Sequence, residues 1–567
     1  MEIAIEPAMP TYSGGLGMLA GDTLRSAADL GLPLVAFTLL HRKGFFRQHI
    51  DANGNQIEDI QPWNPADFCT EEQERVAVSI EGRTVAIRAW RYDLTGCHGH
   101  VIRIYLLDTD LEENSGWDRG LTDHLYGGDT NYRLQQEVVL GMGGVRMCRA
   151  LGHSVNVYHM NEGHAALLTV ALLESQMGGG PLSAPSASDI AHVREQCVFT
   201  THTPVPAGHD RFSTEQTIRI LGGEHAAKLE HLSCFQDGML NMTLLALRLS
   251  RYANGVAMQH GNVSRAMFPE FDIQSITNGV HGLTWISNPI KQLLDAHLPA
   301  WRQDRIYMRN AISLPEQDVL AAHARAKQTL LDEVARRANL TADQAFRPEV
   351  LTLGFARRAA TYKRAGLLFT DPERLAKIAS QAGGLQIIYA GKAHPQDDPG
   401  KALIREVIEN ALLLSSNLLR IVYLENYEWE LGALLTAGVD VWINTPRRPY
   451  EASGTSGMKA AMNGVPSLSV MDGWWIEGCI EGFTGWAIED GACDAEEAAS
   501  LYNKLETAVV PLYLGPPEKW ARLMRTTFAF NGSYFNTNRM VRQYIANAYY
   551  PVKIVQQAPA EHVVQVS

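Results

Sequence analysis

The segment LTLGFARRAATYKRA (351–365) decides the fold class, because an apolar run of strand length ends directly in a group of cations. Its first six residues, LTLGFA (351–356), carry no charge, which is typical of a strand buried on both faces. Arginine binds phosphate in a bidentate way and lysine adds a point charge. We therefore predict an anion site at the end of this strand, with a solvated basic helix start as the alternative, formed by Arg357, Arg358, Lys363 and Arg364.

Similar apolar runs alternate with helical patterns along the whole chain. Runs of strand length occupy residues 32–40, 84–90, 101–108, 155–161, 197–203, 385–391, 419–426 and 439–444, and helical periodicity occupies 134–151 and 321–337. This alternation predicts an α/β fold with buried parallel strands in two doubly wound halves. We place the join between Asn278 and about residue 320. A ligand cleft is expected between such halves, outside the carboxyl ends of the strands.

Composition excludes several classes of function. The chain has 567 residues, 46% hydrophobic, and a formal net charge of -13, so we expect no binding to nucleic acid. The seven cysteines are scattered without a C-x-x-C pair, which indicates a reducing cytoplasm and no disulfide framework. No apolar run is long enough to span a membrane, and the N-terminus does not resemble a secretory signal. The segment CHGH (97–100) lacks partner ligands at zinc spacing, so we predict no metal site.

Two glycine-rich segments are candidates for anion binding. In YSGGLGML, Gly14, Gly15 and Gly17 precede a helical pattern and allow backbone N–H groups to approach a phosphate or sugar, although a structural turn is equally simple. The stronger signal is RRPYEASGTSGMKAAMNGVPSLSVMDGWWIEG (447–478), where small residues form a nest of amides and hydroxyls. Lys459 follows in a helix that we expect to start there. It could pair with a phosphate or form a Schiff base with a cofactor aldehyde, and Glu451 at the mouth could accept hydrogen bonds from a sugar hydroxyl.

Further polar residues stand at the ends of apolar segments, where cleft residues are expected. A single residue of this kind is more often structural than functional. The candidates are Glu162 and His164 in NEGH, His202 in THTP, and Asn278, His281 and Trp285 in TNGVHGLTW.

Together these segments resemble the α-glucan phosphorylase family, and most of all its shorter bacterial and archaeal branch. The resemblance covers nearly the whole chain and includes YGGDTNYRLQQEVVLGMGG, THTPVPAGHDRF, HGNVSRAMFPE and the highly specific EASGTSGMK. It implies the GT-B fold of two Rossmann-like domains with the active site in the cleft between them. We assign residues 1–285 to the first domain, 286–556 to the second and 557–567 to a loosely ordered tail.

The resemblance implies roles for particular residues. Lys459 matches the lysine that binds pyridoxal 5'-phosphate. The cofactor pocket is matched by Gly15, Leu16, Trp285, Tyr427, Gly454, Thr455 and Ser456. Arg358 and Lys363 match residues that contact the substrate and cofactor phosphates. The pocket for the terminal glucose is matched by His164, His202, Asn278, Glu451, Ser453 and Gly454. Lys459, Arg358, Lys363 and His202 are the expected catalytic group.

Two departures from the animal branch stand out. Glu428 follows Tyr427 where that branch has arginine, and an acid cannot neutralise a cofactor phosphate, so that contact must be supplied differently. The chain also begins close to the first glycine-rich segment, from which we expect no N-terminal regulatory extension.

The activity implied by the resemblance is retaining phosphorolysis of an α-1,4-glucan. Inorganic phosphate would cleave glucose from the non-reducing end of glycogen, starch or maltodextrin to give glucose 1-phosphate, with the cofactor phosphate exchanging a proton with it. The backbone amide of His202 or its neighbour would steady the sugar. A homo-oligomer is also implied. Two alternatives stay open: a degenerate glucan-binding homologue, with Trp63, Trp474 and Trp475 stacking on sugars, and a GT-B nucleotide-sugar glucan synthase.

Overall fold

Two parallel sheets dominate the computed structural model, which describes residues 1–177 and 184–550. The larger sheet has six strands in the order β17-β16-β15-β18-β19-β20, with every pairing parallel. In that order they are Leu419–Leu424, Leu385–Ala390, Leu351–Ala356, Val441–Asn444, Ser467–Val470 and Gly485–Ile488. The smaller sheet has four parallel strands in the order β14-β13-β9-β8, namely Ile273–Ser275, Tyr252–Gly255, Cys197–Thr200 and Tyr158–Asn161. The prediction of an α/β fold with parallel sheets is confirmed.

Helices cover both faces of the six-stranded sheet. On one face α13 (Glu316–Arg337) and α16 (Trp429–Gly438) pack against Ile388 and Leu424. On the other face α14 (Pro372–Gln381) and α15 (Asp398–Leu414) pack against Leu353, Ile387 and Ile421. All six residues of β15 are therefore buried, as the uncharged run LTLGFA predicts.

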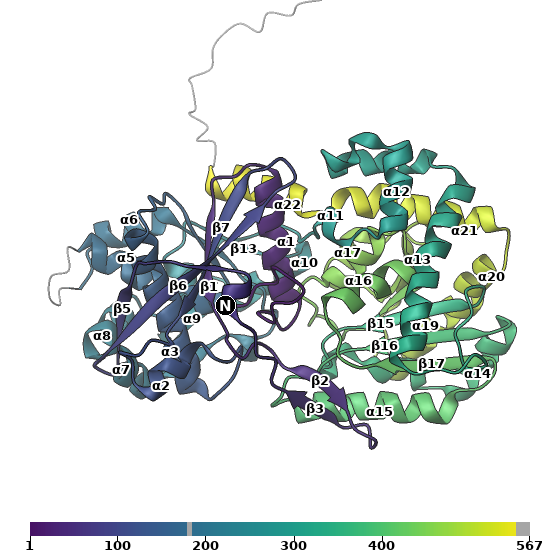
Figure 1. Cartoon of the computed structure of the whole chain (residues 1–567), viewed down its shortest axis with the longest axis horizontal. Coiled ribbons are helices and arrows are strands. Elements are labelled where there is room, and N and C mark those ends of the chain that lie inside the picture. Colours follow the sequence, from purple (N-terminus) through teal and green to yellow (C-terminus); the bar gives the residue numbers. More distant parts are fainter. Residues whose placement is uncertain (178–183, 551–567) are drawn as a thin grey trace, which may run out of the picture.

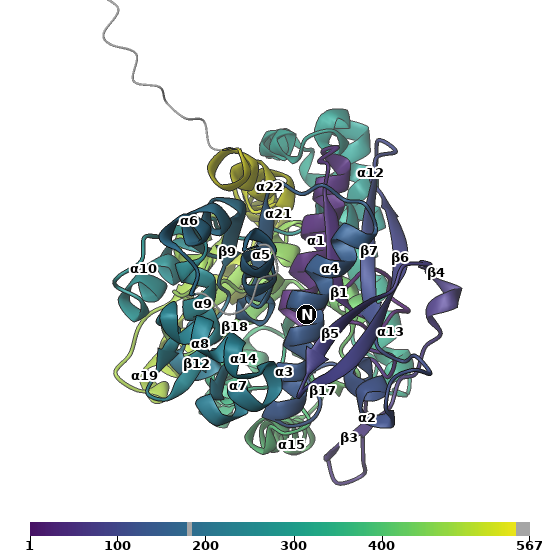
Figure 2. The ribbon, with the colours of Figure 1, turned by 90° about the vertical axis from the view of Figure 1, so that its left-hand side faces the viewer.

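The prediction of a buried parallel strand at 84–90 is wrong. Strand β6 (Arg83–Thr95) pairs antiparallel with β5 (Val76–Ile80) and β7 (Val101–Asp108). Its buried and partly exposed residues alternate, because one face packs on the core while the other reaches solvent. Only β1 (Val35–Leu39) joins β7 in parallel. Figure 2 shows the long strands β6 and β7 on one side of the molecule and helices α6 (Ala187–Gln196) and α10 (Met258–Met267) on the other.

The helical pattern at 134–151 forms one continuous helix with a π turn. Helix α3 (Thr130–Val138) passes through Val139–Gly143 into α4 (Gly144–Ala150). Other helices of this part of the chain are α5 (Leu168–Gln176), α6 (Ala187–Gln196), α7 (Thr214–Leu221), α8 (Gly223–His231), α9 (Met242–Arg248) and α10 (Met258–Met267). Within 1–177 and 184–550, no helix is long and apolar enough to cross a bilayer.

Helices near the two ends of the described chain pack against each other. Figure 1 shows α22 (Thr537–Tyr544), in yellow, returning beside α1 (Gly15–Asp29), in purple. The hydroxyls of Ser26 and Thr537 lie 2.6 Å apart at this contact. The late helices α19 (Asp494–Lys504) and α21 (Pro517–Thr527) precede α22. The tail predicted at 557–567 lies outside the described residues.

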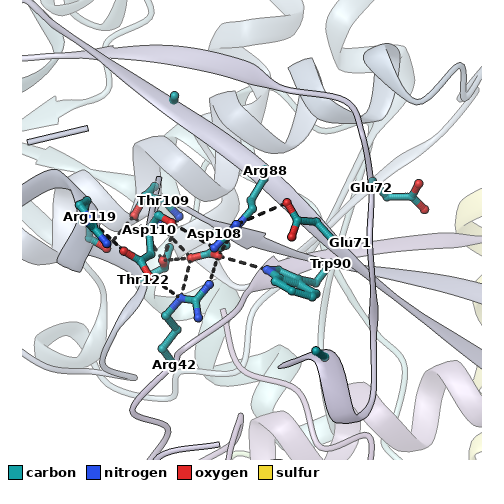
Figure 3. A network of polar contacts seen from close by, with 12 residues as sticks. Arg42, Glu71, Glu72, Arg88, Trp90, Asp108, Thr109, Asp110, Arg119 and Thr122 are labelled. Carbon is teal, nitrogen blue, oxygen red and sulfur yellow. Dashed lines mark hydrogen bonds and ion pairs between the residues drawn. The ribbon is translucent and has the colours of Figure 1, made fainter. Parts of the chain in front are cut away.

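A buried carboxylate, Asp108, connects β7 to neighbouring segments through hydrogen bonds (Figure 3). Asp108, at the end of β7, accepts hydrogen bonds from Arg88 Nε at 2.7 Å, Trp90 Nε1 at 3.1 Å and Thr122 Oγ1 at 3.2 Å. Burial would raise the pKa of Asp108, but the Arg42 guanidinium bound to it lowers that pKa overall. Because its partners join separate segments, we interpret this network as structural.

Candidate functional site

The ends of strands from both parallel sheets surround a cavity of about 680 Å³. All the residues to which the family resemblance gives a role line this cavity: Gly15, Leu16, His164, His202, Asn278, Trp285, Arg358, Lys363, Tyr427, Glu451, Ser453, Gly454, Thr455, Ser456 and Lys459. The candidate His281 does not line it and lies 3.0 Å from Asp29 instead. Since these residues span most of the sequence, only the tertiary fold brings them together.

Local structure explains how the key side chains are placed. Arg357 and Arg358 follow β15 directly, as predicted from the sequence. Helix α17 (Thr455–Ala461) begins after Gly454, whose φ of +86° lies in the left-handed region that glycine adopts without strain. Lys459 is therefore on the first turns of a helix, as predicted, with its side chain directed to the cavity.

Lys459 is a buried amine without a carboxylate partner. Its exposed fraction is 7%, and no ion pair to it occurs among the described residues. Its Nζ lies 3.5 Å from the centre of the Trp285 ring, which stacks against Trp429 at 5.9 Å. Burial lowers the pKa of Lys459 to about 8, against an opposing effect of Asp22. A substantial fraction of this amine is therefore unprotonated and nucleophilic slightly above neutral pH.

A second cluster joins two cations to Glu451. Lys363 Nζ donates to Glu451 Oε2 at 2.5 Å, and Arg357 Nη2 donates to the same oxygen at 2.8 Å. Burial would raise the pKa of Glu451, but the charges of Lys363 and Arg357 lower it to about 2. Glu451 is therefore ionised. It is buried, whereas the sequence predicts it at the mouth of the cavity.

The arginines of the basic segment after β15 have different surroundings. Arg358 is exposed to the cavity. Arg364 turns away, donates to Asp494 at 2.9 Å and binds Glu497. The prediction that Arg364 belongs to the anion site is therefore wrong, because these two carboxylates already bind it.

Two neutral histidines line another side of the cavity. Glu162 Oε2 accepts the backbone N–H of His202 at 2.7 Å and the Thr203 hydroxyl at 2.9 Å. His202 Nε2 lies 2.6 Å from Asn161 Oδ1. Burial lowers the pKa of His202 to about 3 and that of His164 well below its usual value. The expectation that the His202 amide steadies a sugar is wrong for that group, since Glu162 already accepts its hydrogen.

Several buried polar atoms at the cavity have no hydrogen-bond partner within the described residues. They are Asn278 Oδ1, Ser453 Oγ and Arg357 Nη1. An unsatisfied buried polar group costs about 1–3 kcal/mol, so such atoms suggest a place for a polar ligand.

Some lining residues escaped the sequence analysis. Arg357 was recognised only as part of the basic segment. Lys392 is the second residue after β16, so its position near the end of a predicted strand could have identified it. Its Nζ donates to the Phe46 carbonyl at 3.0 Å, and burial lowers its pKa to about 8. Glu428 also lines the cavity, and its carboxylate binds Arg337 at 3.2 Å.

None of the three tryptophans suggested for stacking on sugars is available in the cavity. Trp474 and Trp475 are 2% and 0% exposed, so their rings belong to the core. Trp63 donates from Nε1 to the His41 carbonyl at 2.9 Å and does not line the cavity.

Comparison with known proteins gives a consistent result. The carbohydrate phosphorylase family model matches residues 207–481. The chain is 40% identical to the maltodextrin phosphorylase of Thermococcus litoralis, with 97% of this chain and 70% of that protein covered. It is 38% identical to the glycogen phosphorylase of Mycobacterium tuberculosis, with the same coverage. The glycogen phosphorylase of Aquifex aeolicus is 33% identical, with 97% of this chain and 85% of that protein covered.

Proposed function

This chain belongs to the carbohydrate phosphorylase family, and we propose on that premise that it is a pyridoxal-phosphate-dependent α-1,4-glucan phosphorylase. It cleaves glucose from the non-reducing end of glycogen, starch or maltodextrin. The bond between the anomeric carbon and the glycosidic oxygen breaks, that oxygen receives a proton, and inorganic phosphate bonds to the anomeric carbon. The products are glucose 1-phosphate, with retained configuration, and a glucan one residue shorter.

We further propose the GT-B arrangement, with Rossmann-like domains at 1–285 and 286–556 and the site between them. Two observations support this division. Each of the two parallel sheets lies in one of these ranges, and helices cover both faces of the larger sheet. Segments at strand ends from both ranges line the same cavity.

The observation that best supports the function is Lys459, a buried amine that has no carboxylate partner among residues 1–177 and 184–550 and lies in a cavity that also contains several cations. The residues present fit pyridoxal 5'-phosphate. Lys459 would bind its aldehyde, Trp285 and Tyr427 would flank its ring, and its phosphate would be held by Gly15, Leu16, Gly454, Thr455 and Ser456. When bound, the cofactor supplies a phosphate group that exchanges a proton with the substrate phosphate.

Cations must offset the repulsion between two adjacent phosphates. Two unit charges about 4 Å apart repel by roughly 4 kcal/mol at an effective dielectric constant of 20. Arg358 is exposed to the cavity and Lys363 lies beside it, and together they bind the substrate phosphate. Arg357 contributes through its unpartnered Nη1. These groups are positioned before substrate arrives, so little reorganisation opposes the reaction.

The terminal glucose is held by the remaining lining residues. Asn278 and Ser453 each have an unpartnered oxygen for a sugar hydroxyl, and ionised Glu451 accepts a further hydrogen bond. His202 and His164 are neutral at physiological pH, so they orient the sugar and do not supply the proton. The proton for the glycosidic oxygen comes from the phosphate that Arg358 holds.

The deciding experiment compares wild type with Lys459→Ala. Absorbance is recorded at about 330–420 nm, the range of pyridoxal Schiff bases, before and after borohydride, and glucose 1-phosphate release is assayed on maltodextrin with phosphate. A reducible chromophore and product formation, both absent from the variant, support the proposal. A chromophore without activity favours a glucan-binding homologue. Absence of a chromophore after pyridoxal phosphate is added contradicts the proposal and leaves the nucleotide-sugar synthase.

A further inference from the structure

Asp22 is a buried carboxylate in helix α1. It lies behind the indole ring of Trp285, which contacts Lys459. It is 1% exposed. Its Oδ2 accepts a hydrogen bond from Trp285 Nε1 at 2.6 Å and another from the backbone N–H of His281 at 3.1 Å. Its Oδ1 has no hydrogen-bond partner within the described residues, and Arg25 Nη1 is 3.7 Å away.

Trp285 connects this carboxylate to the cavity. The face of its indole ring meets Lys459 Nζ at 3.5 Å, well within the range of a cation–π interaction, and tryptophan is the strongest aromatic partner for a cation. A hydrogen bond from Nε1 to an anion polarises the indole and increases the negative charge on its face. Asp22 therefore both fixes the ring and strengthens its attraction for the ammonium.

Asp29 is a second buried carboxylate on helix α1, but its partners differ from those of Asp22. Asp29 lies 3.0 Å from His281 Nε2 and 3.4 Å from Arg305 Nη2. Burial would raise the pKa of Asp29, but its hydrogen bonds with His281 and Cys97 lower it to about 2. The hydrogen bonds of Asp22 come from neutral donors instead, and its contact with Arg25 is long at 3.7 Å, so part of its negative charge remains to act on the Lys459 amine.

We propose that Asp22 is a positioning residue for Lys459, acting through Trp285 to hold the Lys459 ammonium in its place in the cavity. Only the cofactor-binding role of Lys459 rests on the proposed function, since the contacts among the three side chains do not depend on it. Burial lowers the pKa of the Lys459 amine, and the charge of Asp22 raises it. Asp22 thus favours the ordered, protonated form of the amine until a ligand arrives.

The test measures the Lys459 amine in the full chain without cofactor. Wild type, Asp22→Asn and Asp29→Asn are treated with trace acetic anhydride from pH 6 to 10, and labelling of each lysine is quantified by peptide mass spectrometry. Lys401, which pairs with Glu58 at 2.9 Å, is the internal reference. We expect Asp22→Asn to lower the labelling midpoint of Lys459 by about one pH unit, with roughly tenfold faster labelling at pH 7. Asp29→Asn should leave that midpoint unchanged.

An unchanged midpoint in folded Asp22→Asn, or an equal shift in Asp29→Asn, overturns the proposal. Circular dichroism verifies the fold. If Asp22→Asn does not fold, Trp285→Phe replaces it: phenylalanine keeps a ring but removes the Nε1–H donor, so the midpoint should fall, and an unchanged midpoint again overturns the proposal. Failure of wild type to bind pyridoxal phosphate would count against the proposed function and leave the labelling result intact.

Discussion

Glu451 and Glu162 line the same cavity and are buried to nearly the same degree, at 7% and 8% exposure. Glu451 follows β18 and binds Lys363 and Arg357, whose charges lower its pKa to about 2 against the effect of burial. Glu162 follows β8, its hydrogen-bond donors in the described part of the chain are neutral N–H and O–H groups, and burial raises its pKa. The identity of the partners, not the extent of burial, therefore sets the direction in which the pKa of each of these two carboxylates shifts.

The same contrast extends to the surroundings of each glutamate. The wall formed after β15 and β18 contains Arg358, Lys363 and Lys459, and is suited to phosphates. The wall formed after β8 and β9 contains His164 and His202, which burial keeps neutral, and is suited to an uncharged sugar. The predictions below test this division.

The largest effect on activity is expected from removing the Lys459 amine. Lys459→Ala should abolish the chromophore and reduce phosphorolysis by more than about a thousandfold, because the phosphate supplied by the cofactor would be lost. Lys401→Ala, outside the cavity, is the matched control and should keep full activity. Substantial activity in Lys459→Ala would remove Lys459 from its proposed role.

Arg358→Ala should reduce kcat/KM for phosphate by about 10²–10³-fold, the usual cost of removing one preorganised group that stabilises charge. Steady-state kinetics with phosphate and maltodextrin varied separately provide the measurement. Arg336→Ala, which removes an exposed arginine bound to Glu333, is the control. An equal loss in kcat/KM for both substrates would contradict the assignment of phosphate to this wall.

The two glutamates should differ in how their removal changes stability with pH. Glu451 has a folded pKa of about 2, below its unfolded value of 4.5, so its ionisation contributes about 3 kcal/mol above pH 4.5 that is lost as pH falls toward 2. Glu451→Gln should therefore be destabilised at pH 7 by about this amount, measured by urea unfolding, and less so in acid.

Glu162→Gln is the counterpart to that experiment. The raised folded pKa of Glu162 means that its contribution is present below its unfolded value and is lost as pH rises through the folded pKa. The stability of Glu162→Gln relative to wild type should thus improve as pH rises. The same slope for both variants would contradict the contrast between the glutamates.

The smallest effect is expected at His202. Loss of a neutral hydrogen bond of about 1–1.5 kcal/mol predicts roughly a tenfold increase in KM for glucan in His202→Ala. Because its pKa is about 3, His202 should add no titration step to the pH profile of wild type between pH 5.5 and 7.5. A step in that range that disappears in His202→Ala would show that the imidazole titrates during catalysis.

Much of the fold and the site could be predicted from local sequence. The uncharged run LTLGFA predicts β15 with its observed bounds, and the small residues before Lys459 predict the start of α17. The resemblance to a known family identified the residues that the fold then brings to one cavity. The strand at 84–90 differs from the predicted buried parallel strand because one of its faces reaches solvent and its pairing with β5 and β7 is antiparallel.

The sequence by itself determined the α/β class, the strand ends and the residue types available for chemistry, because periodicity and turn composition act over a few neighbouring residues. Only the tertiary structure decided which charges meet. Arg357 binds Glu451 while Arg364 binds Asp494, although both come from one short basic segment. Likewise Asp22 contacts Trp285, whose ring contacts Lys459, and such contacts between residues far apart in the chain depend on packing that no local pattern records.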